Sequence, residues 1–243
     1  MFDYWLNPLL PVKLVNMGSQ LLFAWAVADV QPRKDHFERR FLLCSAASMV
    51  LAALLPILSE NLWFITATLL VIYAATALTI RCCWRGNRAT ILFLSAAVFS
   101  VDHIASMLDT LTSLFFPEQL SYIASQQMNG YILLNYILWR LLLFLLIRHL
   151  VRRGRLQVEE SAVSGTFAAL MLVLSLFVNL YLNLIFQNLT DSHTFWFSFI
   201  NGVMNILIST LLLFCQYTVV RENRARFQLQ ISDLLREIGR AHV

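Results

Sequence analysis

The stretch that decides the fold is ATILFLSAAVFSVDHIASMLDTLTSL, residues 89–114. It contains no Gly or Pro, and its only acidic residues are Asp102 and Asp109. At 1.5 Å per residue, a helix of this length can cross the roughly 30 Å hydrocarbon core of a bilayer. Lipid offers the backbone no hydrogen-bond partner, so a spanning segment must be helical. Residues 89–114 therefore predict a transmembrane helix.

The composition extends this prediction to the whole chain. Of the 243 residues, 59% are hydrophobic and 13% are charged, and the mean hydropathy is +0.68. Soluble domains are about 45–50% apolar and about 25% charged. A soluble enzyme is therefore excluded, and we expect an all-α, polytopic membrane bundle. The net charge of +4 is too small to indicate nucleic-acid binding.

Apolar runs between charged clusters give seven candidate spans, each about the length that a bilayer requires. They are residues 7–28, 41–58, 62–80, 89–114, 131–151, 164–186 and 194–219. We therefore expect a transmembrane domain over residues 1–219, followed by a cytoplasmic helix over residues 220–236.

The basic residues predict how the bundle is oriented. Sixteen of the eighteen Lys and Arg residues lie in loop 29–40, in loop 81–88, within 148–155 or in the tail 221–240. The alternate connections contain none, and cytoplasmic loops are the ones that retain Lys and Arg. The N-terminus is therefore expected outside and the C-terminus inside. A signal peptide cleaved after Ala28 is disfavoured, because export would place the first basic loop outside.

Four ionisable residues lie inside the candidate spans: Lys13, Asp102, Asp109 and Arg140. Such groups are costly in lipid and need a partner or a wet cavity. Helical rise places Asp102 about 20 Å above the inner end and Arg140 about 13 Å below the outer surface. We predict an Asp102–Arg140 ion pair, with Lys13 near the outer face. The charges either fix the helix register, line an outward-facing ligand pocket or form a proton or ion pathway.

Amide side chains extend this polar interior. Asn183 lies on the sixth predicted helix, and Asn201 and Asn205 are four residues apart on the seventh, so the last two share one face. Interhelical hydrogen bonds of this kind contribute about 0.6 kcal/mol on average, so structural packing is the default interpretation. Because the amides lie in the outer half or at mid-depth, they also predict a shallow extracellular ligand cavity.

The tail, TVVRENRARFQLQISDLLRE, predicts a continuous helix beyond the last span. Its heptad seam is spaced for pairing with a second copy. The seam comprises Val220, Arg224, Phe227, Ile231 and Leu234. The alternative is an amphipathic helix lying on the bilayer. Residues 237–243 match the translation of a common sequencing adapter, so we expect a non-native tail there and a natural protein that continues beyond about Arg236.

The four cysteines do not predict a disulfide framework. Cys44 and Cys215 lie in apolar runs, and Cys82 and Cys83 are neighbours in a short basic loop. Free cysteines commonly behave as small buried hydrophobic residues, and cytoplasmic thiols stay reduced. We therefore expect two buried thiols and a reduced cytoplasmic pair. No catalytic or metal-binding motif is found in the sequence.

Seven spans with an outside N-terminus, followed by RENRARFQLQISDLLRE (residues 221–237), resemble membrane sensor histidine kinases with GHKL-type ATP-binding domains. These belong to the peptide-pheromone, quorum-sensing class. The resemblance covers the architecture and implies a homodimer in a bacterial plasma (inner) membrane, an extracellular ligand such as a peptide, and a response regulator as downstream partner. ATP and magnesium would bind a kinase domain that is not within these 243 residues, so no cofactor is expected in this chain.

The sequence therefore favours the signal-input region of a sensor histidine kinase. One alternative is a small secondary transporter or permease component that uses Asp102, Asp109 and Arg140 as a substrate or proton site. Seven spans do not divide into two repeats, which many transporters show. The other alternative is a membrane-embedded assembly or regulatory subunit without a ligand.

Overall fold

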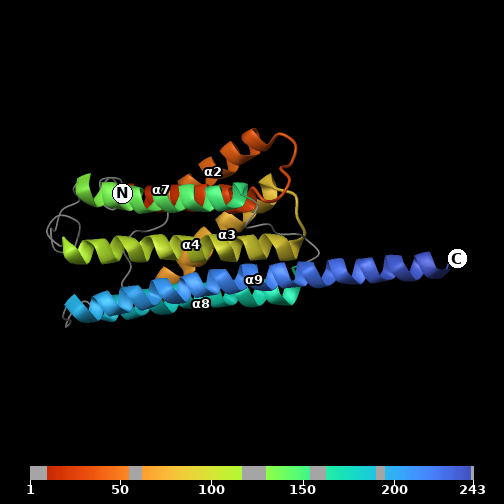
Figure 1. Cartoon of the computed structure of the whole chain (residues 1–243). Helices are drawn as coiled ribbons and strands as arrows, with labels where there is room; N and C mark the ends of the chain where they lie inside the picture. The colour runs from red at the N-terminus through yellow and green to blue at the C-terminus, as the bar shows by residue number, and fades with distance from the viewer. Residues whose placement is uncertain (1–9, 55–61, 117–129, 154–162, 190–194, 242–243) are drawn as a thin grey trace.

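The computed structural model describes residues 10–54, 62–116, 130–153, 163–189 and 195–241 (Figure 1). Within these ranges the chain is all-helical, apart from one isolated bridge between Arg33 and Trp84. The helices are α1 (Leu10–Ala28), α2 (Phe37–Leu54), α3 (Leu62–Cys83), α4 (Arg88–Phe115), α7 (Gly130–Arg152), α8 (Gly165–Leu189) and α9 (Phe195–Ala241). The predicted all-α class is confirmed.

Each helix covers most of one predicted span, and α9 continues through the predicted tail as one helix of 47 residues. Judged by length and composition alone, α4 and α7 are the two helices in these ranges that could cross a membrane. The seven-span arrangement thus remains a prediction.

Helix α4 is the central element of the bundle. It packs against α1, α3, α7, α8 and α9. In Figure 1, α1 and α7 lie on one side of α4, and α8 and α9 lie on the other. Small side chains such as Ser95, Ala97 and Ala105 are fully buried along it, which lets neighbouring helices approach closely. The helix begins at the cap residue Asn87, whose side chain accepts a hydrogen bond from the Thr90 backbone N (2.8 Å).

The α1–α2 and α3–α4 connections lie together at the end of the bundle from which α9 projects (Figure 1). Lys34 N donates to the carbonyl of Cys83 (2.9 Å), and Arg85 N donates to that of Pro32 (2.8 Å). The Lys34 ammonium group also donates to the carbonyl of Arg81. The two basic loops therefore form one joined structure, as expected if both lie on the same side of a membrane.

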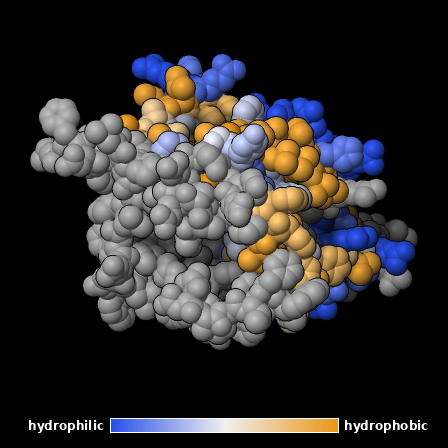
Figure 2. All heavy atoms as spheres, turned by 90° about the vertical axis from the view of Figure 1, so that its left-hand side faces the viewer, coloured by the Kyte–Doolittle hydropathy of each residue, from blue (hydrophilic) through white to orange (hydrophobic). Residues whose placement is uncertain are grey.

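The exterior of the bundle is apolar, whereas part of its interior is polar. On α7, Leu134 and Leu145 are 61% and 53% exposed, whereas Asn135 and Arg140 are buried. Leu42 and Phe214 are similarly exposed on α2 and α9. Figure 2 shows apolar side chains covering the coloured flank of the molecule, with hydrophilic ones near its margin. Large exposed apolar patches indicate contact with a membrane or with other proteins.

Candidate functional site: a buried polar network around α4

A buried ion pair joins α4 to α7. The guanidinium of Arg140 donates to the carboxylate of Asp109, and the two side chains are only 4% and 5% exposed. Arg140 also donates to the carbonyl of Tyr136 (3.1 Å) and to the hydroxyl of Ser106 (3.3 Å). Its guanidinium carbon lies 4.8 Å from the centre of the Tyr136 ring. Arg140 is therefore held by a carboxylate, a hydroxyl, a carbonyl and an aromatic ring.

The predicted Asp102–Arg140 pair is wrong: the partner of Arg140 is Asp109. Helical side chains lean toward the N-terminus of their own helix. Because α4 and α7 are antiparallel, Arg140 leans toward Gly130, as its bond to the Tyr136 carbonyl shows. Asp109 leans the opposite way, so the two side chains converge. Asp102 leans away from Arg140, and depth alone did not reveal this.

Asp102 instead takes part in a network that joins α1, α3 and α4. The Gln20 side-chain nitrogen donates to Asp102 (3.0 Å), and the Gln20 side-chain oxygen accepts from the Thr76 hydroxyl (3.0 Å). Gln20 and Thr76 are 4% and 0% exposed. A single Thr in the apolar run of α3 carries no pattern from which this contact could be predicted.

Further contacts surround the Asp109–Arg140 pair. The Asn135 side chain donates to the backbone carbonyl of Asp109 (3.4 Å), and the Trp139 indole donates to the Thr112 hydroxyl (2.8 Å). These residues lie beside Arg140 on α7 or beside Asp109 on α4. They lock the two helices in register, and sequence reasoning missed them because each is an isolated polar residue.

Several buried polar atoms of the network find no hydrogen-bond partner among the described residues. They are Asp102 Oδ1, Asp109 Oδ1 and Arg140 Nε. Buried polar groups are normally satisfied by protein or by ordered water. The carboxylate oxygens can therefore accept a hydrogen bond or a proton, and Arg140 Nε can donate to water or to a polar group of a small ligand.

A second polar contact lies on the opposite side of α4. The hydroxyls of Ser100 and Ser175 are 3.2 Å apart, and the Gln216 side chain donates to Ser175 (3.4 Å). All three residues are at most 2% exposed. The Phe93 ring also meets the Tyr217 ring edge-on, with centroids 5.6 Å apart. Helix α4 thus contacts the polar network with one side and α8 and α9 with the other.

Four of the predicted site residues cannot be placed at the level of their side chains. Lys13 lies in α1, Asn183 in α8, and Asn201 and Asn205 in α9, but their side chains lie outside what the structure describes. Their part in a ligand cavity remains a prediction.

The predicted dimer seam begins too early in the sequence. Val220 is 1% exposed and belongs to the hydrophobic core of its own chain, so it cannot also face a second copy. Further along α9, Phe227, Ile231 and Leu234 are 42%, 43% and 58% exposed. Arg224 lies between the buried and exposed parts and is partly exposed. An exposed apolar seam is therefore present from Phe227 onward.

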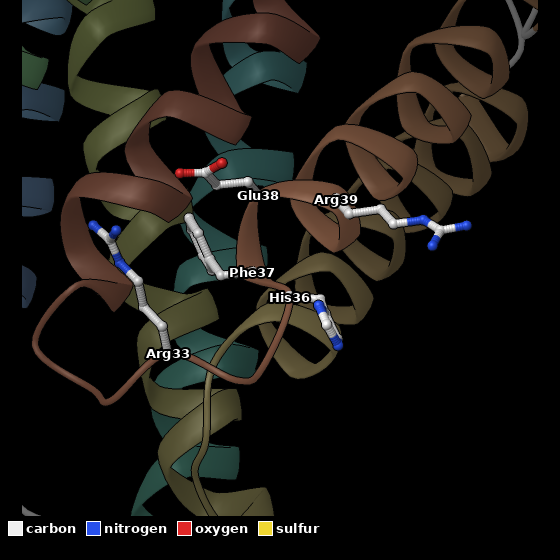
Figure 3. A pocket seen from close by; sticks show the side chains of 5 residues that line it. All are labelled: Arg33, His36, Phe37, Glu38 and Arg39. Carbon is white, nitrogen blue, oxygen red and sulfur yellow. The ribbon is translucent and has the colours of Figure 1, made fainter.

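A surface pocket at the α1–α2 connection is a weaker candidate. It is lined by Arg33, His36, Phe37, Glu38 and Arg39, and Figure 3 shows the guanidinium groups of Arg33 and Arg39 pointing away from each other. Arg33 is already paired with Asp29 (2.8 Å) and stacked over Phe37 (4.5 Å). The basic groups do not converge on a common point, so they form no anion site.

No protein-family model, curated protein or solved structure matches this chain. Within the described ranges, no group of three His, Cys, Asp or Glu side chains is arranged to hold a metal ion.

Proposed function

We propose that the chain is a membrane-embedded signal-input module of the sensor histidine kinase type. In this proposal all seven helices span the membrane, with the basic connections in the cytoplasm. The apolar exterior and the location of the basic α1–α2 and α3–α4 connections at one end support the membrane assignment. The sensor-kinase resemblance favours an extracellular peptide as ligand and a homodimer as the signalling unit.

The observation that carries the proposal is the position of α4. One side of α4 holds Asp102 and Asp109. The other side packs against α9 through Phe93, which contacts Tyr217, and against α8 through Ser100, which contacts Ser175. Helix α9 then runs on beyond the bundle as a single helix (Figure 1). A shift of α4 would therefore be transmitted directly to the projecting segment.

A ligand would act by changing the contacts of the α4 network. It can shift the equilibrium between two arrangements only if it binds one of them more tightly than the other. A polar ligand that competes for Asp109 or Arg140 would weaken the contact between α4 and α7. The resulting movement of α4 would rotate or translate α9, which is the expected output of the module.

The test is a fusion in which α9 drives a measurable output. Residues 1–236 are joined in helical register to the dimerisation and catalytic domains of a characterised sensor kinase, with one to seven residues inserted at the junction. Because rigid helices transmit rotation, kinase activity should vary with a period of about 3.5 residues. Activity that does not depend on the insert length would contradict the proposal.

Two controls make the fusion experiment specific. Four glycines inserted between Val220 and Arg221 should abolish the periodicity, because they uncouple the projecting helix from the bundle. Arg140→Gln should change the basal kinase activity several-fold. Arg85→Gln should leave it unchanged, because the Arg85 side chain is exposed and pairs only with Asp35 on the neighbouring loop.

The transporter alternative is supported by the unpartnered buried atoms around Asp102 and Asp109. It predicts proton uptake by the purified chain in lipid vesicles under an imposed pH gradient, and loss of this uptake in Asp102→Asn. Two results together would favour transport over sensing: a proton flux that Asp102→Asn abolishes, and a kinase activity of the fusions that does not depend on the length of the insert.

A further inference from the structure

Three of the four cysteines converge where α2 and α3 meet. Cys44 on α2 packs against the core cluster that contains Cys83, the last residue of α3. Arg40, one turn before Cys44 on α2, reaches the backbone carbonyl of Cys82, and the thiols of Cys44, Cys82 and Cys83 are close enough to influence one another electrostatically. The apolar run around Cys44 predicted a separate buried thiol. The fold instead creates a cluster of three thiols.

Neighbouring contacts hold this cluster in place. The Arg40 guanidinium donates to the backbone carbonyl of Cys82 (3.4 Å). The Trp84 ring packs edge-on against Phe37 and Phe41, with centroids 5.0 and 6.0 Å away. Both contacts join the first turns of α2 to the end of α3. The thiols are therefore kept close by the surrounding structure rather than by a flexible loop.

The three thiols differ in their access to solvent. Cys82 is exposed, Cys44 is partly exposed and Cys83 is fully buried. Cys83 lies beyond the predicted span 62–80, and burial raises the pKa of its thiol to about 12, with a smaller effect from Cys44. The thiolate is the reactive form of cysteine, so Cys83 is the least reactive of the three.

We propose that Cys44 and Cys82 are a peroxide-responsive thiol pair that forms an intramolecular disulfide between α2 and α3. The exposed Cys82 thiolate attacks hydrogen peroxide. The O–O bond breaks, hydroxide leaves, and Cys82 becomes a sulfenic acid. The Cys44 thiolate then attacks the Cys82 sulfur, so that the S–S bond forms while the S–O bond breaks and hydroxide leaves. In total, two thiols are oxidised by two electrons and one peroxide is reduced to two waters.

The geometry favours this pairing over the alternatives. A disulfide requires sulfur atoms about 2.05 Å apart, and Cys44 lies one turn after Arg40, which contacts the Cys82 carbonyl, so the two thiols are on neighbouring turns of α2 and α3. Cys82 and Cys83 are consecutive residues of a helix, so their side chains point in directions about 100° apart. Cys215 lies on α9, exposed on the side of the bundle. Cys44 is thus the reaction partner that Cys82 can reach.

The disulfide would lock the inner end of the bundle, because it ties the start of α2 to the end of α3 beside the first residues of α4. This site does not depend on the proposed sensing function. It would form in the same way in a transporter or in a regulatory subunit.

The test counts free thiols in the purified full chain in lipid nanodiscs. After treatment with hydrogen peroxide, the protein is denatured and its thiols are tagged with a polyethylene-glycol maleimide. The reduced chain should carry four tags and the oxidised chain two, and peptide mapping should identify a Cys44–Cys82 link. Four tags after oxidation, a Cys82–Cys83 link or a cross-linked dimer would overturn the proposal.

Two matched variants separate the roles of the thiols. Cys83→Ser should still lose two of its three tags on oxidation. Cys44→Ser should form no intramolecular disulfide, and its Cys82 should accumulate as a sulfenic acid that reacts with dimedone. If Cys83→Ser prevents the disulfide while Cys44→Ser permits it, the assignment of the pair is wrong. The wild-type peptide map keeps the test valid even if a variant fails to fold.

Discussion

At the level of single residues, side-chain direction decides which charges meet. Asp102 and Asp109 lie two helical turns apart on α4, and Asp109 is the one that pairs with Arg140. The lean of helical side chains toward their own N-terminus selects Asp109. The types of residue in the site could therefore be predicted from the sequence, but their pairing could not. Thr76 was missed because one hydroxyl in an apolar run carries no pattern.

The Asp109–Arg140 pair should make a large contribution to stability. Removing one partner leaves an uncompensated buried charge, so Asp109→Asn and Arg140→Met should each lower the free energy of unfolding by about 3–5 kcal/mol. The double variant should be less destabilised than the sum of the single variants, because neither charge is then left alone. Steric-trapping measurements in bicelles would provide these free energies.

The control for this double-mutant cycle uses Asp102, which was predicted to pair with Arg140 from its depth in the membrane. Asp102→Asn combined with Arg140→Met should show a clearly smaller coupling energy than the Asp109 pair, because Arg140 contacts Asp109 directly and acts on Asp102 only through its charge at longer range. An equally large coupling energy for Asp102 and Arg140 would show that the pairing described above is incorrect.

At the level of elements, the apolar runs located the helices well, because α-helices need long stretches without breakers. The position at which α9 leaves the bundle and its apolar seam becomes exposed was less well predicted. A heptad pattern does not distinguish an apolar residue that packs within its own chain from one that faces a partner. Val220 fits the seam by spacing, yet it is buried in its own bundle. The seam from Phe227 onward is consistent with either a dimer or a bilayer surface.

We expect the projecting part of α9 to pair with a second copy. Single cysteines at Phe227, Ile231 or Leu234, in a background without the four native cysteines, should cross-link in membranes under oxidation. Leu229→Cys is a matched control, because Leu229 is also apolar and is 64% exposed but lies on the opposite face of the heptad. Equal cross-linking at all four positions, or none, would instead favour a helix that lies on the bilayer.

At the level of the whole molecule, charge distribution is more informative than hydrophobic periodicity. The alternation of basic connections predicted which ends of the helices lie together, and the joined α1–α2 and α3–α4 loops agree with it (Figure 1). The central position of α4 could not be predicted in the same way. Both the core-facing and the outward-facing sides of these helices are apolar, so periodicity does not reveal which helix is surrounded by the others.

The proposed topology predicts which end of the bundle faces the cytoplasm. In the same cysteine-free background, Asp35→Cys lies on the basic α1–α2 connection, where the Asp35 side chain is 83% exposed. The second position is Phe116, which follows the opposite end of α4 and is 56% exposed; it is replaced in Phe116→Cys. Because basic loops stay in the cytoplasm, a membrane-impermeant maleimide should label Phe116→Cys in intact cells and Asp35→Cys only after permeabilisation. Labelling of Asp35→Cys in intact cells would place the basic end outside, and the projecting part of α9 could then no longer carry a signal into the cytoplasm.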